Sequence, residues 1–377
     1  QGYDVVALFM INWKDTVGTL SGSCPWEEDI IVAELVAKKL NIPFYWVDFT
    51  DQYRKKVVDY MFDEYKKGRT PNPDILCNRE IKFDLFIDKA RELGADYIAT
   101  GHYCRHEIVI KENYEVHRLL AGIDKNKDQS YFLCQLSQEQ LKNVLFPVGG
   151  LLKENVRKIA EELKLPSSHK KDSQGICFIG KVSLPDFLKQ KLIPHEGVTV
   201  EIPNDNIKYL EYKKLLPPFE NINYEKIINL SKAFKYNINE GKIVGKHRGA
   251  YYYTIGQNKG LNIGGRPEPS FVIGIDVENN ILFTGLGKNH PGLYRYGLFI
   301  RNDEIHWIRE DLKMKPGESR PYLVRIRYRQ PLEKAMLYYY DEGIYIIFEK
   351  SQRGITPGQF AAWYDGEELI GSGVISE

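Results

Sequence analysis

The chain has 377 residues, of which 43% are hydrophobic and 27% are charged, and its formal net charge at pH 7 is +1. This length predicts two or three domains, and the composition is that of an ordinary globular protein. No run of about 18 apolar residues is present, which excludes a membrane span. The near-neutral charge means that any nucleic-acid binding depends on a local basic face.

Strands and helices alternate in the first part of the chain. Predicted strands span 5–10, 43–49 and 95–101, and predicted helices span 27–40, 53–67 and 80–93. The apolar run at 5–10 is typical of a parallel strand buried on both faces. The alternation predicts an open parallel sheet that binds ligands at the carboxyl ends of its strands, where Met10 and Gly101 lie.

The pattern changes after residue 165. The stretch 203–241 is rich in Asn, Lys and Tyr and is predicted to be an insertion, helical around 224–234. Short β-like segments follow from residue 251 and predict a small barrel. We therefore expect an α/β protein with an N-terminal open parallel sheet at 1–164, a small central domain at 165–268 and a C-terminal β-barrel at 269–377.

Five cysteines are spread along the chain without a C-x-x-C pair: Cys24, Cys77, Cys104, Cys134 and Cys177. This spacing argues against a structural zinc site or a thioredoxin-like motif and favours free thiols in a reducing cytoplasm, and we expect no metal ligands among the site residues. We expect Cys104 and Cys134 to be buried structural residues. Cys24 precedes Pro25 at a predicted helix start, where a structural role is again the simpler interpretation.

The segment from Pro71 to Cys77 (PNPDILC) combines two prolines with an aspartate and a cysteine. The prolines restrict the backbone around Asn72. Cys77 follows close to the start of a predicted helix, whose positive end would favour a reactive thiolate. The alternative is a turn that ends in a small buried cysteine.

A second cysteine lies in a basic segment, KKDSQGIC, which ends at Cys177. Basic neighbours favour a thiolate, and Gly175 lets a substrate approach the backbone. A surface loop that ends in a core cysteine is the alternative. Together, Cys77 and Cys177 indicate a pair that acts on sulfur, one carrying a persulfide and the other resolving it as a disulfide.

Two polar segments carry candidate binding residues. Residues 101–105 (GHYCR) lie at a predicted strand end, where the glycine would admit a nucleotide and His102 would contact phosphate or support the site. Residues 127–133 (KDQSYFL) are polar enough to bind an RNA backbone. A structural histidine and a charged turn are the respective alternatives.

Arginines recur at every second position near the C-terminal end. If residues 322–329 form one strand, Arg325, Arg327 and Arg329 lie on the same face and form a basic stripe for phosphates. A solvated strand face is the alternative.

Seven segments resemble the signature blocks of the bacterial and organellar tRNA-specific 2-thiouridylases, and they occur in that family's order across nearly the whole chain. They are GRTPNPDILCNREIKF (68–83), ATGHY (99–103), NKDQSYFL (126–133), KDSQGICFIG (171–180), YTIGQ (253–257), RYRQ (327–330) and TPGQ (356–359). Several of these blocks are longer than seven residues, so chance does not account for the agreement.

The resemblance implies a reaction. The family uses ATP and Mg²⁺ to adenylate the C2 oxygen of the uridine at wobble position 34 in tRNAs for Lys, Glu and Gln, and then replaces this oxygen with sulfur that a relay protein has delivered. Cys177 would carry the persulfide, and Cys77 would free the product by forming a disulfide with Cys177. Asp74 would assist proton transfer.

The resemblance also implies a set of binding residues. The adenine nucleotide would contact Met10 and Gly101, the target base would contact Asn72, Pro73 and Asp74, the tRNA would contact Lys127, Asp128, Gln129, Arg327 and Tyr328, and His102 and Gln359 would support activity. We expect the protein to act as a monomer.

One family feature is absent from these 377 residues: the opening strand, the SGGVDSS pyrophosphate loop and the following helix. Such a segment would comprise roughly 20–25 residues. Because its backbone amides should hold the phosphates, we expect that the chain as written does not adenylate tRNA and that it is truncated. The long 203–241 stretch also departs from the shortest family members, and we assign it no function.

Two other functions are consistent with parts of the sequence. The first is a tRNA-binding remnant without catalysis, which the absent loop would favour. The second is an ATP pyrophosphatase that adenylates a small molecule. Such an enzyme would need neither the Cys77 and Cys177 segments nor a basic C-terminal strand.

Overall fold

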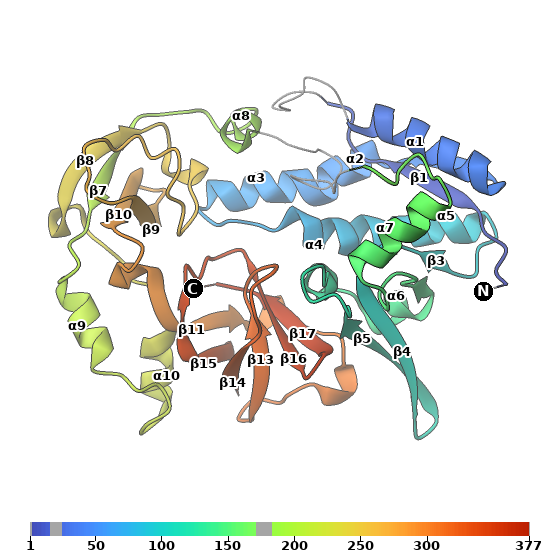
Figure 1. Ribbon diagram of the computed structural model, residues 1–377. Helices are drawn as coiled ribbons and strands as arrows, with labels where there is room; N and C mark the ends of the chain where they lie inside the picture. Colours follow the sequence, from blue (N-terminus) through green and yellow to red (C-terminus); the bar gives the residue numbers. More distant parts are fainter. Residues whose placement is uncertain (1, 16–24, 171–182, 377) are drawn as a thin grey trace. The chain divides into compact units, whose positions relative to one another are not determined.

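The computed structural model describes residues 2–15, 25–170 and 183–376, and the chain divides into two compact units whose elements are labelled in Figure 1. The first unit comprises 1–60, 73–190 and 367–369, and the second comprises 61–72, 191–366 and 370–377. No helix in the described ranges combines the length and the apolar character needed to cross a bilayer.

Two pairs of parallel strands and a series of helices form the first unit. Strand β1 (Ala7–Ile11) pairs with β2 (Phe44–Asp48), and β3 (Ile98–Ala99) pairs with β6 (Val144–Leu145). The helices are α1 (Pro25–Leu40), α2 (Thr50–Tyr53), η1 (Arg54–Val58), the start of α3 (Asp59–Lys66), α4 (Pro73–Cys77), η2 (Asn78–Leu85), α5 (Phe86–Glu92), η3 (Ser130–Leu133), α6 (Gln138–Lys142), α7 (Lys153–Glu162) and α8 (Leu184–Leu188). Parallel strands with helices between them confirm the predicted α/β class.

The first strand is more exposed than its sequence predicts. It begins at Ala7 rather than Val5, and Val5 and Val6 are exposed by 53% and 46%. In the described part of the chain its strand neighbour is β2 alone, so the expected burial on both faces is wrong. Pairing of the third strand with β6 extends over only Ile98 and Ala99, which makes that strand shorter than predicted.

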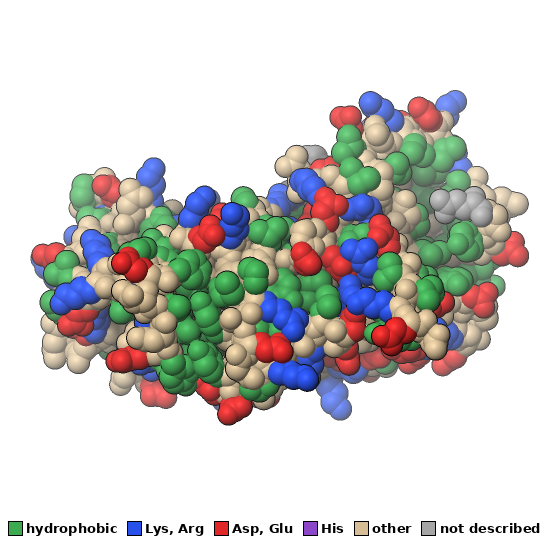
Figure 2. All heavy atoms as spheres, turned by 90° about the horizontal axis from the view of Figure 1, so that it is seen from below, with side chains coloured by type: hydrophobic (Ala, Val, Ile, Leu, Met, Phe, Trp, Pro, Cys, Tyr) green, Lys and Arg blue, Asp and Glu red, His purple; other side chains and the backbone are tan. Residues whose placement is uncertain are grey.

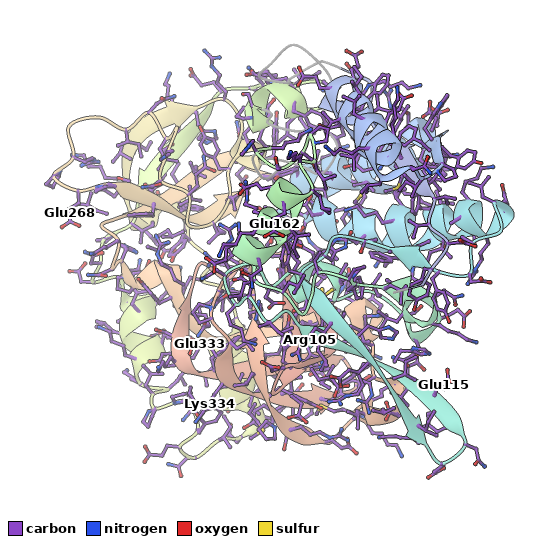
Figure 3. The ribbon with its side chains drawn as sticks, turned by 45° about the vertical axis from the view of Figure 1, so that its right-hand side comes forward. Arg105, Glu115, Glu162, Glu268, Glu333 and Lys334 are labelled. Carbon is purple, nitrogen blue, oxygen red and sulfur yellow. The ribbon has the colours of Figure 1, made fainter. Side chains whose placement is uncertain are left out.

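A β-hairpin that the sequence analysis did not predict follows β3. Strands β4 (Cys104–Lys111) and β5 (Tyr114–Ala121) pair antiparallel over their full lengths. Figure 3 shows Arg105 near the base of this hairpin and Glu115 toward its far end. The hairpin is extended by residues 368–369, which pair antiparallel with β5.

One long helical run contains the cysteine motif. Helix α4 continues directly into the π-helix η2, where Phe83 departs from helical geometry with φ −111° and ψ 17°, and then into α5. The helix predicted at 80–93 therefore begins earlier, at Pro73. A π-helical stretch inside an α-helix is uncommon and is often found at functional sites.

The second unit contains a four-stranded sheet in the order β8-β7-β10-β9. Its strands are β7 (Gly197–Glu201), β8 (Lys242–His247), β9 (Ser270–Asp276) and β10 (Ile281–Leu286). Its core includes Val200, Ile273 and Phe283, all 5% exposed or less. The last strand of this sheet ends at Leu286, so the sheet includes residues beyond 268, where the central domain was predicted to end.

Antiparallel strands form the C-terminal part of the second unit and enclose a core that includes Leu337, Ile346 and Trp363, each with no exposed surface. The order β11-β15-β14-β13-β16 agrees with the predicted β-rich C-terminal domain. The strands are β11 (Tyr294–Arg301), β12 (Ile305–Trp307), β13 (Ser319–Arg325), β14 (Glu333–Tyr340), β15 (Gly343–Arg353), β16 (Phe360–Asp365) and β17 (Glu368–Val374).

The predicted insertion packs against this C-terminal part. It contains α9 (Ile207–Lys213) and α10 (Tyr224–Ser231), and α10 confirms the helix expected around residue 224. Leu230 is fully buried in a cluster with Tyr345 and Ile347. Because α10 covers strands β11 and β15, the stretch contributes to the core as well as to the surface.

Candidate active site

Asp74 and Cys77 lie on the short helix α4. Because the helix begins at Pro73, Asp74 occupies its first turn, where the helix dipole stabilises negative charge. Cys77 follows at the i+3 position, on the same face, and is completely buried. Cys77 is thus the fifth residue of the helical run, close to its start as predicted but past the first four residues, whose amides are free of helical partners.

Polar side chains fasten the π-helix that follows Cys77. The Asn78 amide donates to the carbonyl of Phe132 at 3.0 Å, and Arg79 Nη1 donates to Gln135 Oε1 at 2.8 Å. Gln140 Nε2 donates to the carbonyl of Arg79 at 2.9 Å. Asn78 and Arg79 are not among the predicted site residues, although a polar Asn and Arg directly after a candidate cysteine are a signal visible in the sequence.

His102 lies in an apolar environment. Its ring packs against Phe83 and Phe146, with centroid distances of 5.7 Å and 6.3 Å, and its Nδ1 lies 2.8 Å from Thr100 Oγ1. Burial, with a smaller contribution from Lys82, holds the pKa of His102 well below its ordinary value. The ring is therefore neutral at pH 7, which suits hydrogen bonding and packing better than binding a phosphate by charge.

The KDQ segment faces inward at two of its three positions. Asp128 is 4% exposed, and its Oδ1 accepts the backbone N–H groups of Gly122 and Ser130, each at 3.1 Å. Gln129 Oε1 accepts the backbone N–H of Tyr103 at 3.0 Å. The Gln129 contact ties the segment to the chain that follows Gly101.

The predicted nucleotide residues lie at strand ends in the first unit. Met10 is half-buried in β1, and Gly101 is exposed just after β3, with no heavy atom within 4 Å of the position that a Cβ would take. Asn12, which is not among the predicted site residues, is fully buried, and within the described residues its amide nitrogen and oxygen have no hydrogen-bond partner. A buried amide of this kind fits a hydrogen-bonding ligand such as adenine.

The prediction that three arginines form a stripe on one strand is wrong. Strand β13 ends at Arg325, which is 8% exposed and lies over the Tyr364 ring at 4.9 Å. The chain then turns, and Arg329 adopts a positive φ of 63° with its guanidinium 5.1 Å from the Tyr328 ring. Arg327 is exposed and donates to the carbonyl of Gly354 at 3.0 Å, so the arginines do not share a strand face.

The remaining candidates are placed as follows. Gln359 lies in the second unit directly before β16, and its amide donates to backbone carbonyls of the segment that precedes Asn72. Cys104 and Cys134 are fully buried, which confirms their structural interpretation. Cys177 and Cys24 lie outside the described residues.

Charges of both signs share the visible surface. Figure 2 shows one face of the molecule, on which Lys and Arg side chains are interspersed with Asp and Glu. Among the described residues, opposite charges also pair directly, as in Arg118 Nε with Glu368 Oε2 at 2.8 Å and Lys56 Nζ with Glu80 Oε2 at 3.1 Å. On the face shown, the basic side chains are therefore not separated from the acidic ones.

Three family descriptions match successive parts of the chain. Residues 1–181 match the tRNA methyl transferase HUP domain, residues 225–286 match the tRNA methyl transferase PRC-barrel domain, and residues 299–375 match the aminomethyltransferase β-barrel domain. These matches define the class as a HUP-type α/β domain followed by two β domains, in agreement with the predicted fold.

The chain is similar over its full length to curated proteins named tRNA-specific 2-thiouridylase MnmA. The protein from Christiangramia forsetii is 57% identical over 380 residues, with 100% of this chain and 94% of the relative covered. The Flavobacterium johnsoniae protein is 56% identical with the same coverage, and the Bacillus subtilis protein is 42% identical with 89% of the relative covered. The chain belongs to the tRNA-specific 2-thiouridylase family.

Proposed function

We propose that this protein is a tRNA sulfurtransferase that makes 2-thiouridine at wobble position 34. The observation that carries the proposal is the 57% identity, across the whole chain, to a protein named tRNA-specific 2-thiouridylase. The hydrogen bonds that fix Asn78 and Arg79 directly after Cys77 support it, because a reactive cysteine needs a fixed environment.

ATP is the proposed cosubstrate, bound with Mg²⁺ at the strand ends that carry Met10, Asn12 and Gly101. When bound, it supplies the adenylyl group that converts the uridine C2 oxygen into a leaving group. Met10 would contact the adenine, Asn12 would donate to and accept from it, and the open backbone at Gly101 would allow the nucleotide to approach closely.

Sulfur transfer uses Asp74, Cys77 and Cys177. The outer sulfur of a Cys177 persulfide attacks C2 and displaces the activated oxygen. The Cys77 thiolate then attacks the Cys177 sulfur, which breaks the sulfur–sulfur bond to the base, leaves the new sulfur on C2 and forms a Cys77–Cys177 disulfide. Asp74 moves a proton at the base, and an external thiol reductant restores the cysteines.

The proposed tRNA contacts come from separate segments of the sequence. Asn72, Pro73 and Asp74 would contact the target base, and Lys127, Arg327 and Tyr328 would contact the tRNA backbone. Asp128 and Gln129 would contact the tRNA beside Lys127, from a segment whose backbone their side chains hold through hydrogen bonds. The substrates are the tRNAs for Lys, Glu and Gln, the sulfur arrives from a relay protein, and the enzyme acts as a monomer in a reducing cytoplasm.

The proposal is tested by a sulfur-transfer assay on unmodified tRNA with ATP, Mg²⁺ and a persulfide donor, read by retardation of thiolated tRNA in a mercury-containing gel. The chain as it stands is compared with a version preceded by an SGGVDSS strand–loop–helix segment. Cys77→Ala and Cys177→Ala are the test variants. Cys134→Ala, at another buried cysteine, is the matched control.

We expect the extended protein and the Cys134→Ala control to thiolate tRNA and both test variants to fail. If the extended protein binds tRNA but forms no thiolated product under any condition, the sulfurtransferase proposal is wrong and a binding function replaces it. If Cys77→Ala retains full activity, the disulfide step described above is wrong.

A further inference from the structure

Three sequence motifs that are far apart in the chain meet within the second unit. Gln359 Nε2 donates to the carbonyls of Thr70 at 2.8 Å and Pro71 at 3.1 Å. The backbone N–H of Thr70 donates to the carbonyl of Pro357 at 2.8 Å. The hydroxyl of Thr70 lies 3.1 Å from that of Thr254. Thr70 is thus held through its N–H, its carbonyl and its side chain.

Gly358 allows the closest approach between these segments. It adopts a φ of +88°, and a Cβ at this position would lie 2.9 Å from the Thr70 carbonyl oxygen and 3.0 Å from the Thr70 nitrogen. A side chain here would therefore be strained by the backbone conformation and would also collide with Thr70. No rotamer change relieves a contact with backbone atoms.

The residues that hold Thr70 are themselves fixed. The N–H of Gly358 donates to the carbonyl of Ile375 at 2.9 Å, and the N–H of Ile375 donates to the carbonyl of Gln359 at 2.8 Å. On the other side, Gln257 Oε1 accepts the N–H of Thr254 at 3.1 Å. Because Gly358, Gln359 and Thr254 are themselves held by hydrogen bonds, they can fix the position of Thr70.

The held segment leads directly into the base-contacting motif. Pro71 precedes Asn72, and Pro73 follows it, so the rings on both sides restrict the backbone of Asn72. With Thr70 and the Pro71 carbonyl fixed, little conformational freedom remains for Asn72. The position of this residue is therefore set by the TPGQ and YTIGQ motifs.

We propose that Thr254, Gly358 and Gln359 are positioning residues that hold the Thr70–Asn72 loop in the conformation needed for thiolation. The proposal rests on the function proposed above, in which Asn72 contacts the target base. Gln359 acts through its hydrogen bonds to the loop, and the TPGQ segment, at the far end of the sequence, places the first residue of the NPD motif.

The first test compares two glycine variants of the protein that is used in the thiolation assay above. Gly358→Ala introduces the collision with Thr70. Gly317→Ala is the control, because Gly317 has nearly the same φ of +89° but no heavy atom within 4 Å of the added Cβ. Hydrogen exchange of the Thr70 amide is measured without tRNA, followed by kcat for thiolation and Kd for tRNA.

Relative to Gly317→Ala, we expect Gly358→Ala to speed exchange of the Thr70 amide by about fivefold to tenfold, since the N–H loses its bond to Pro357. The kcat should fall at least about tenfold while the tRNA Kd changes less than about twofold, because only geometry at the base is disturbed. Unchanged exchange at Thr70 would overturn the positioning role, whatever happens to activity.

Two milder variants cover the case in which Gly358→Ala does not fold. Gln359→Glu keeps the shape of the side chain but replaces both donors with oxygen, facing the Thr70 and Pro71 carbonyls. Thr254→Val removes a single hydroxyl contact. Both should increase Thr70 exchange and lower kcat, with the larger effect in Gln359→Glu.

A Gln359→Glu protein that loses tRNA affinity without a change in Thr70 exchange would show direct contact with RNA and would sink the proposal. The exchange measurement does not depend on activity. If the wild-type protein fails to thiolate tRNA, the sulfurtransferase function is refuted, while the exchange of Thr70 still reports whether these residues hold the loop.

Discussion

Gln129 and Tyr103 are hydrogen-bonded to each other in both directions. The side-chain oxygen of Gln129 accepts the backbone N–H of Tyr103 at 3.0 Å, and the backbone N–H of Gln129 donates to the carbonyl of Tyr103 at 2.9 Å. The side chain of Gln129 therefore replaces a backbone partner in a part of the chain that has no regular strand pairing. The loop after Gly101 depends on this residue for its shape.

Replacing Gln129 by Ala should lower the free energy of unfolding by about 1–3 kcal/mol, because the buried N–H of Tyr103 loses its acceptor. Gln129→Glu keeps an acceptor oxygen and should lose much less stability. Urea denaturation monitored by circular dichroism measures both changes. If Gln129→Ala is as stable as the wild type but binds tRNA more weakly, the side chain contacts RNA instead.

Gly149 lies against the backbone of Cys104, and a Cβ at Gly149 would be only 1.6 Å from the Cys104 carbonyl oxygen. Gly149→Ala should cost about 1–3 kcal/mol or more of stability, as expected when extra atoms are forced into a packed site. Gly150→Ala is the control, because nothing lies within 4 Å of its added Cβ. Equal urea midpoints for the two variants would contradict this packing.

Acid should destabilise the β4–β5 hairpin. His106 Nε2 and His117 Nδ1 are 3.0 Å apart. When both rings are neutral, the N–H of one ring donates to the unprotonated nitrogen of the other. Burial lowers the pKa of both histidines. At His106, the neighbouring His117 lowers the pKa further. At His117, Lys142 also lowers the pKa, whereas Glu115 and Glu139 raise it. As the pH falls, the histidines of the unfolded chain become protonated at their ordinary pKa of 6.5, before those of the folded protein. The stabilisation is therefore fully present above this pKa and is lost as the pH falls below it.

The variant that tests this pair is His117→Gln. Between about pH 5 and pH 6.5 it should reduce the proton uptake on unfolding by about one, measured from urea midpoints across that range. The wild-type protein, measured over the same pH range, is the reference. A slope that is the same in His117→Gln and in the wild type would remove the histidine pair from the acid response.

Thiol reactivity should separate Cys104 from accessible cysteines. Burial, together with the nearby Asp128, raises the pKa of the Cys104 thiol well above its ordinary value. In the folded protein at about pH 8, alkylation of Cys104 should be at least about tenfold slower than that of a free cysteine, because a thiol with a raised pKa has less thiolate. Peptide mass mapping with and without urea measures this, and rapid native labelling would contradict the burial.

The residues proposed to carry the chemistry of this protein can be picked out from the sequence by itself. The NPD–Cys77 and KDQ segments are short contiguous blocks, and contiguous blocks keep their identity whatever fold surrounds them. The parallel strands were also predictable, because apolar runs alternating with amphipathic helices have few other solutions. The β4–β5 hairpin was missed because it interrupts that alternation.

The directions of the side chains were decided by the tertiary structure. Arg325 is buried although its sequence pattern predicts a basic stripe, because the strand ends there and the chain turns. His102 is neutral because Phe83 and Phe146 surround it. Gln359 reaches Thr70 across 289 positions of sequence. No local pattern encodes such a contact, because a hydrogen bond between distant residues exists only after the strands and loops that carry them have packed.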